Sequence, residues 1–190
     1  SISFANLILA AGNPGNRIGV VSFASDVTTN TGFTTSLTTV TNAINGLNAN
    51  GGTNTENAFN VAGGLFPTTT PCDRVQALIF LSDGVPTVGS LQGCDFDGDS
   101  CPDGYCGAYT TYPCTRDCCN YPGGPNCCTN GAIYRSATAK ARANVYSIGL
   151  VTGMTQPTLT VARAVFNGVQ DSGYYEAPSP SDLAAIYAQI

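Results

Sequence analysis

The stretch that most constrains the fold is a nearly continuous apolar run at residues 75–81 that is followed by Ser82-Asp83-Gly84. Continuous hydrophobic runs of this length are typical of strands buried on both faces of a parallel sheet, because helices cover such a sheet from both sides. Polar residues that follow the strand emerge at the carboxyl edge, where open α/β sheets bind their ligands. The sequence therefore predicts that Asp83 lies at a binding edge.

Strand and helix signals alternate along the rest of the chain. Strands are predicted at residues 17–23, 75–81, 145–150 and about 174–176, with an antiparallel edge strand near 27–33, and helices at 37–47, 54–65, 132–143, 158–166 and 183–190. Such alternation requires right-handed crossovers between parallel strands. We predict one domain over residues 1–190 with a Rossmann-like, doubly wound α/β fold, whose mostly parallel sheet is flanked by helices on both faces.

Composition limits the function classes. Only 10% of residues are charged, against about 25% in ordinary domains, so Thr, Asn, Ser and Gly must cover the surface, as is more common outside cells. The net charge is −5 and only seven residues are Lys or Arg, which argues against nucleic acid because phosphate binding needs clustered cations. No apolar run reaches the ~18 residues of a membrane span. We expect an extracellular or cell-surface location.

The nine cysteines are Cys72, Cys94, Cys101, Cys106, Cys114, Cys118, Cys119, Cys127 and Cys128. All but Cys72 lie in an irregular insertion at residues 84–130 that is rich in Cys, Gly and Pro, which is typical of a disulfide framework formed in an oxidising compartment. Zinc is the weaker alternative, since the chain has no histidine and no Cys-x-x-Cys spacing. The odd count leaves at least one cysteine, for which Cys72 is a candidate, without a partner in this chain.

The insertion also contains an acidic loop. Asp95, Asp97, Asp99 and Asp103 occupy positions 1, 3, 5 and 9 of that loop, so their oxygens can converge on one Ca²⁺, while without a cation the four charges repel one another. The alternative is a solvated acidic loop held only by its disulfides.

The string Gly51-Gly52-Thr53 precedes the predicted helix at 54–65. It places the Thr53 hydroxyl near a helix N-terminus, on a loop that neighbours Asp83, and a hydroxyl beside a carboxylate suggests a hard cation. Simpler alternatives are that Thr53 only caps the helix and that Asp83-Gly84 only turns the chain.

The chain resembles a von Willebrand factor type A domain in four stretches that follow one another in the family's order. They are the strand at 17–23, the helix at 37–47, the Gly51-Gly52-Thr53 string and the Leu81-to-Gly84 stretch. The resemblance implies a metal-ion-dependent adhesion site, built from an Asp-x-Ser-x-Ser loop after the first strand, a threonine matched by Thr53 and an aspartate matched by Asp83. Mg²⁺ or Mn²⁺ there would bind an acidic side chain of a protein partner or a neighbouring subunit. The acidic loop is similar to the calcium repeats of thrombospondin type 3 modules.

The chain departs from that family at its start. Only residues 4–11, about half a helix, precede the turn before Arg17, so the family's first strand is absent, and Ser1 and Ser3 are the only serines that could belong to the missing loop. The absent strand would lie between those that end at Phe23 and Leu81, and its absence would leave two rows of backbone groups unpaired. We therefore hypothesise that the chain is a fragment, with the strand supplied by upstream sequence, or that another chain donates it.

Two functions fit these observations. The first is an extracellular adhesion or protein-recognition module that binds its partner at the carboxyl edge. The second is a structural subunit of an extracellular filament, sheath or matrix in which the metal site has degenerated. We expect no enzyme, because the chain lacks a histidine base, a Gly-x-Ser-x-Gly elbow and the lysine of a P-loop.

Overall fold

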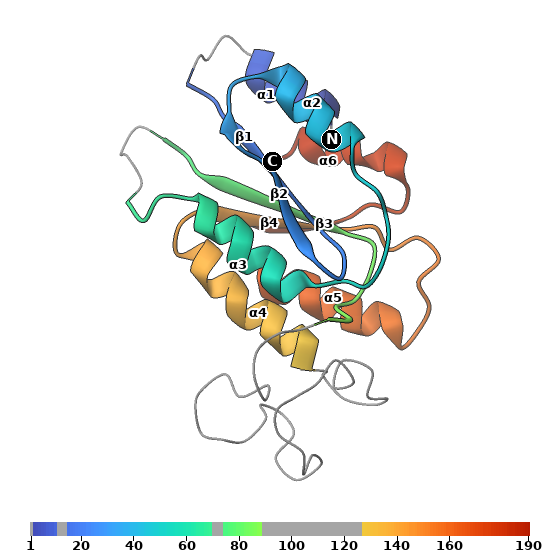
Figure 1. Ribbon diagram of the computed structural model, residues 1–190. Helices are drawn as coiled ribbons and strands as arrows, with labels where there is room; N and C mark the ends of the chain where they lie inside the picture. Colours follow the sequence, from blue (N-terminus) through green and yellow to red (C-terminus); the bar gives the residue numbers. More distant parts are fainter. Residues whose placement is uncertain (1, 11–14, 70–73, 89–126) are drawn as a thin grey trace.

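A computed structural model describes residues 2–10, 15–69, 74–88 and 127–190 (Figure 1). Its elements, in chain order, are α1 Ile2–Ala10, β1 Ile18–Phe23, β2 Val27–Thr34, α2 Leu37–Asn45, α3 Thr55–Leu65, β3 Ala77–Ser82, α4 Cys127–Lys140, β4 Asn144–Gly149, α5 Thr158–Val169, β5 Gly173–Glu176, a 3₁₀ turn at Pro180–Asp182 and α6 Leu183–Tyr187. The predicted strand–helix alternation is confirmed. None of the described helices combines the length and the apolar character that crossing a membrane requires.

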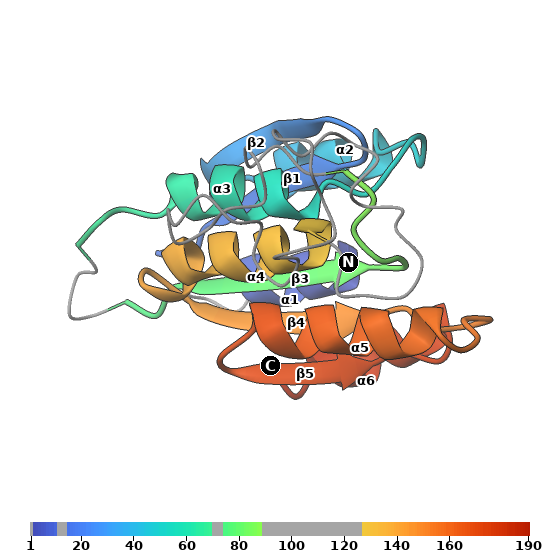
Figure 2. The same cartoon turned by 90° about the horizontal axis from the view of Figure 1, so that it is seen from below.

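The strands form two sheets. β3, β4 and β5 are parallel, with Ala77 opposite Asn144 and Tyr146 opposite Gly173. β1 and β2 form a separate antiparallel pair, and Figure 2 shows the strands in the order β2, β1, β3, β4, β5 across the molecule. In the described part of the chain no strand lies between β1 and β3.

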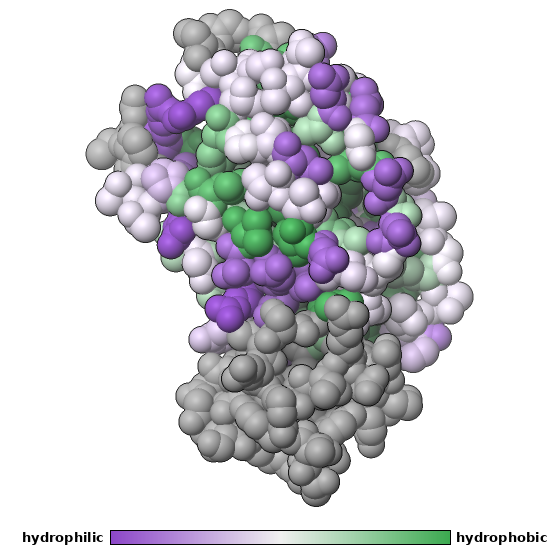
Figure 3. All heavy atoms as spheres, viewed as in Figure 1, coloured by the Kyte–Doolittle hydropathy of each residue, from purple (hydrophilic) through white to green (hydrophobic). Residues whose placement is uncertain are grey.

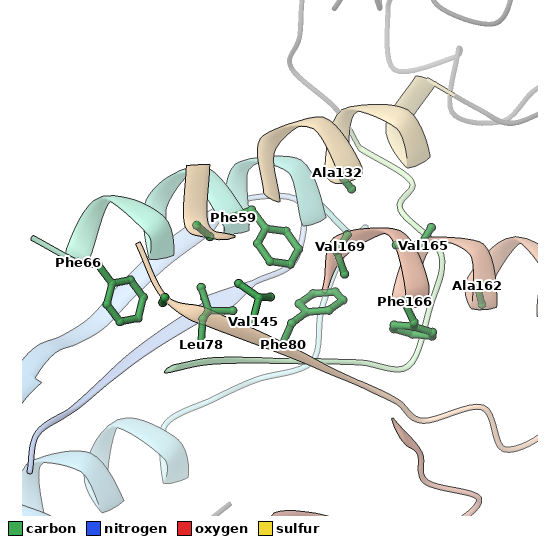
Figure 4. Packing of buried hydrophobic residues seen from close by; sticks show 12 residues of the cluster. Phe59, Phe66, Leu78, Phe80, Ala132, Val145, Ala162, Val165, Phe166 and Val169 are labelled. Carbon is green, nitrogen blue, oxygen red and sulfur yellow. The ribbon is translucent and has the colours of Figure 1, made fainter. Parts of the chain in front are cut away.

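Two layers of helices enclose the strands because side chains alternate between the faces of each strand. Leu78 and Phe80 of β3 point into the larger core, shared with α3, α4 and α5, where Phe59 and Phe166 are almost fully buried (Figure 4). The other face of the parallel sheet packs on α6, where Ile148 and Ile186 are buried. Helices α1 and α2 lie with α6 on this second side (Figure 1). The predicted α/β class with helices on both faces is confirmed.

The end of the predicted insertion needs correction. The sequence suggested irregular structure to residue 130 and a helix from 132, but α4 already begins at Cys127. Its N-terminal half packs on α3: a Cβ at Gly131 would lie 3.0 Å from the Glu56 Oε2 atom, and Glu56 is only 3% exposed. Tertiary packing therefore extends the helix over Cys, Thr, Asn and Gly, residues with low helix propensity.

At β5, the last strand of the parallel sheet, a polar cluster joins α5 to β5. Arg163 donates two hydrogen bonds to the Glu176 carboxylate, at 2.6 and 2.9 Å, and the Tyr174 hydroxyl donates a third at 2.6 Å. The hydrogen bond from Arg163, followed by that from Tyr174, lowers the pKa of Glu176 to about 2. This acid is therefore committed to a structural contact.

Candidate functional site at the carboxyl edge of the sheet

The Gly51–Asn54 loop leads from α2 into α3 and lies against the residues that follow β1. The Gly52 amide donates to Ser25 Oγ at 2.8 Å, the Asn54 amide to the Ala24 carbonyl at 2.8 Å, and Asn54 Nδ2 to the Ser25 carbonyl at 3.2 Å. Three hydrogen bonds thus fix this loop to the residues that directly follow β1.

The same loop is also bonded to the residues that follow β3. The Thr53 amide donates to Thr87 Oγ1 at 2.8 Å, and the Thr53 carbonyl accepts from the amides of Thr87 and Val88 at 3.0 and 3.3 Å. β1 and β3 therefore end at one edge and run in the same direction. The predicted meeting of the two loops at the carboxyl edge is what the structure shows.

Both glycines of this loop are required by the geometry. Gly51 has φ +94°, a conformation that residues with a Cβ rarely adopt. A Cβ at Gly52 would lie 2.7 Å from Val88 Cγ2 and 2.9 Å from Thr87 Oγ1. The absence of side chains is what allows the loop to approach the segment after β3.

At this edge Thr53 lies beside the Ser82–Gly84 segment that contains Asp83. The half-buried Thr53 has its Oγ1 3.5 Å from the position of a Cβ on Gly84, the residue after Asp83, and Asp83 itself is exposed. Asn54, and not Thr53, caps α3, since Asn54 Oδ1 accepts from the Asn57 amide at 3.1 Å. The capping role that the sequence allowed for Thr53 is therefore wrong. The Thr53 hydroxyl makes no hydrogen bond to any described residue.

Other predicted site residues lie elsewhere or outside the described ranges. Ser3 is in the first turn of α1 and exposed. Several predicted site residues lie outside the described residues: Ser1, the four aspartates of the acidic loop and the cysteines from Cys72 to Cys119. Cys127 begins α4, and Cys128 is 2% exposed and disulfide-bonded. Within the described ranges no three His, Cys, Asp or Glu side chains cluster in a way that could hold a metal ion.

Sequence analysis missed the supporting residues Ser25 and Thr87. Each is a small hydroxyl residue within five positions of a strand end, and each accepts a backbone amide of the Gly51–Asn54 loop. A hydroxyl shortly after a buried strand was the available signal. It is a weak one, because Ser and Thr are abundant in all the loops of this chain.

Comparison with known proteins agrees with this geometry. Residues 1–85 match the family model of the von Willebrand factor type A domain. The structure is similar to the von Willebrand factor domain of the type V pili tip protein Mfa5 from Porphyromonas gingivalis, with a TM-score of 0.71 and 17% identity over 99% of this chain and 83% of that chain. The fold is that of a von Willebrand factor type A domain. The matched range spans α1 through β3 and contains both Thr53 and Asp83.

Two further solved structures share the von Willebrand factor type A fold of this chain. The D319A mutant of the PilB minor pilin from Streptococcus sanguinis has a TM-score of 0.65 and 13% identity, over 99% of this chain and 52% of that one. Protein BatB from Bacteroides thetaiotaomicron has a TM-score of 0.54 and 15% identity, over 99% of this chain and 83% of that one. No curated protein sequence matches the chain.

Proposed function

We propose that this chain is a von Willebrand factor type A module, exposed outside the cell, that recognises a protein partner at the carboxyl edge of its sheet through a divalent cation. The observation that supports this proposal is the loop that hydrogen-bonds to both β1 and β3 and thereby holds the Thr53 hydroxyl beside the segment of Asp83. The module is a binding protein and not an enzyme.

The two side chains suit a hard cation. Both offer oxygen, the Thr53 hydroxyl has no described hydrogen-bond partner, and the Asp83 carboxylate is exposed. Mg²⁺ in proteins keeps several waters and needs only one or two carboxylates, so Thr53 and Asp83 would supply part of its coordination. When bound, the cation would offer a position to a carboxylate of the partner. It would also offset the repulsion between an acidic partner and a chain of net charge −5.

Replacing Asp83 with alanine should weaken Mn²⁺ binding at least about tenfold, because the site loses its exposed anionic ligand. The 190-residue chain is titrated with Mn²⁺ alone, and electron paramagnetic resonance measures the concentration of free Mn²⁺ at each point. Asp26→Ala is the matched control, since Asp26 is also an exposed acid just after a strand and should leave the titration unchanged. Equal affinities of wild type and Asp83→Ala would refute the metal site.

The second candidate is a structural subunit of an extracellular filament. It is favoured by the pilus tip protein and the minor pilin among the similar structures. In that case Asp83→Ala should leave assembly into filaments unchanged, whereas the adhesion proposal requires that it abolish partner binding. Electron microscopy of the assembled material distinguishes the two. Both functions place the chain outside the cell or at its surface.

We further propose that Ca²⁺ orders the acidic loop at residues 95–103 within a framework of disulfides. Removing Ca²⁺ should expose this loop to protease, because four carboxylates repel one another without a cation. The measurement is limited proteolysis with and without a chelator, with the cleavage sites located by mass spectrometry. The Asp97→Asn/Asp99→Asn double variant should be cleaved even with Ca²⁺ present, and Asp26→Asn should not. Cleavage of the wild type that is indifferent to chelator would contradict the proposal.

A further inference from the structure

Cations that lack an acidic partner gather at one edge of the molecule. Two described cations, Arg135 and Arg163, form ion pairs with acids. The other described cations lie shortly before β1, β3 or β4 in the sequence, and they are Arg17, Arg74, Lys140 and Arg142. Because these three strands run in the same direction, all of these side chains belong to the amino edge, where the strands begin. The candidate metal site lies at the opposite edge.

Two of the amino-edge cations have a role within the fold. Lys140 Nζ donates to the Gly168 carbonyl at 2.6 Å, and Arg142 Nη1 donates to the carbonyls of Gly63 and Phe66 at 3.1 and 3.4 Å. These acceptors lie at the C-terminal ends of α5 and α3, where backbone carbonyls have no partner within the helix. Lys140 and Arg142 are therefore explained by helix capping, which leaves Arg17 and Arg74 without an assigned role.

Exposed apolar side chains accompany these two arginines, which are themselves exposed and form no ion pair with any described residue. Val75, next to Arg74, is 83% exposed. Phe33 lies near the end of β2 that pairs with the start of β1, is 38% exposed and contacts Phe66 with ring centroids 5.2 Å apart. Figure 3 shows hydrophobic side chains between β2 and α3. We call Arg17, Phe33, Arg74 and Val75 the amino-edge surface; its mixture of arginine and apolar groups is typical of protein interfaces.

The carboxyl edge carries the opposite charge. Asp26, between β1 and β2, and Asp83, after β3, are both exposed, and neither forms an ion pair with a described residue. Leu47, which is 43% exposed, precedes the Gly51–Asn54 loop and adds an apolar side chain on this side. The β1–β2 hairpin therefore has an exposed cation, Arg17, at its open end and an exposed acid, Asp26, at its turn.

We propose that the amino-edge surface of one copy of this chain docks head to tail on the carboxyl edge of a second copy, where it contacts Asp26 and Leu47. The charges of the two surfaces are complementary, which favours this orientation and disfavours contacts between two like edges. The contact joins different surfaces of the two copies, so it can repeat from copy to copy and give an open chain of subunits. Asp83 is not required, so the proposal is independent of the metal site.

Sedimentation velocity of the 190-residue chain, without added divalent cation, tests this proposal. The chain should self-associate, and less so as NaCl rises from about 0.05 to 0.5 M, because salt screens the charges. Arg17→Glu/Arg74→Glu and Asp26→Arg should each raise the dissociation constant at least about tenfold, since like charges then face each other. An equimolar mixture of these two variants should associate again, because their reversed edges are complementary. Val75→Ser should also weaken association, whereas Leu7→Ser, which removes an exposed apolar side chain of α1, should not.

Several results would overturn the proposal. In one, the wild type remains a monomer at concentrations up to about 1 mM, which is the range of weak contacts. In another, either charge-reversed variant associates as strongly as the wild type, or their mixture stays monomeric although both are folded by circular dichroism. Binding of a glutamate-rich peptide to a chain that stays monomeric would assign the amino-edge surface to a different acidic partner. Mn²⁺ binding is measured separately with Asp83→Ala, so either proposal can fail without the other.

Discussion

Replacing Phe166 with alanine should lower the free energy of unfolding by about 3–5 kcal/mol, the usual cost of removing a buried phenylalanine. Phe166 is fully buried on α5. Its ring lies 6.1 Å from that of Phe80 and 5.7 Å from that of Tyr174, measured between centroids. It also packs on Gly149, where a Cβ would come within 2.6 Å of the ring. The variant therefore leaves a cavity bordered by the three strands β3, β4 and β5.

Urea denaturation followed by circular dichroism measures this loss. Leu7→Ala is the control, because Leu7 is 58% exposed and its truncation should change stability by no more than about 0.5 kcal/mol. Phe166→Leu should fall between the two, since it keeps most of the apolar volume. A loss below about 1 kcal/mol for Phe166→Ala would show that the core does not pack as described.

Replacing Gly52 with alanine should weaken Mn²⁺ binding at least about tenfold, although residue 52 is not a proposed ligand. The added Cβ would lie 2.7 Å from Val88 Cγ2 and 2.9 Å from Thr87 Oγ1. Thr87 is the acceptor for the Thr53 amide, so relieving the overlap must move Thr53 relative to Asp83. Overpacking of this kind also costs about 1–3 kcal/mol of stability.

The same Mn²⁺ titration measures the effect of this substitution, together with a thermal melt. Gly64→Ala is the matched control: it adds a methyl group in α3 with no atom within 4 Å, and it should stabilise the helix by up to about 1 kcal/mol without affecting the metal. Unchanged Mn²⁺ affinity in a folded Gly52→Ala variant would mean that the loop does not position the metal ligands.

The amino-acid sequence by itself determined the order of elements and the edge of the sheet at which the site lies. The largely apolar run at 75–81 specified β3, and the Gly51-Gly52-Thr53 string specified the loop before α3. Both signals are local: hydrophobic continuity in one case and glycine conformations in the other. The metal-binding roles of Thr53 and Asp83, like the calcium loop and the disulfide framework, remain predictions.

Only the tertiary structure decided which groups hold the site together. Ser25 and Thr87 bond the Gly51–Asn54 loop across 27 and 34 positions of sequence, and no local pattern specifies pairings at such separation. The start of α4 at Cys127 follows from packing beside Glu56, against the propensity of its first residues. The division into two sheets is also tertiary, because strand pairing depends on which backbone edges meet in space, whereas sequence periodicity reports only which faces are buried.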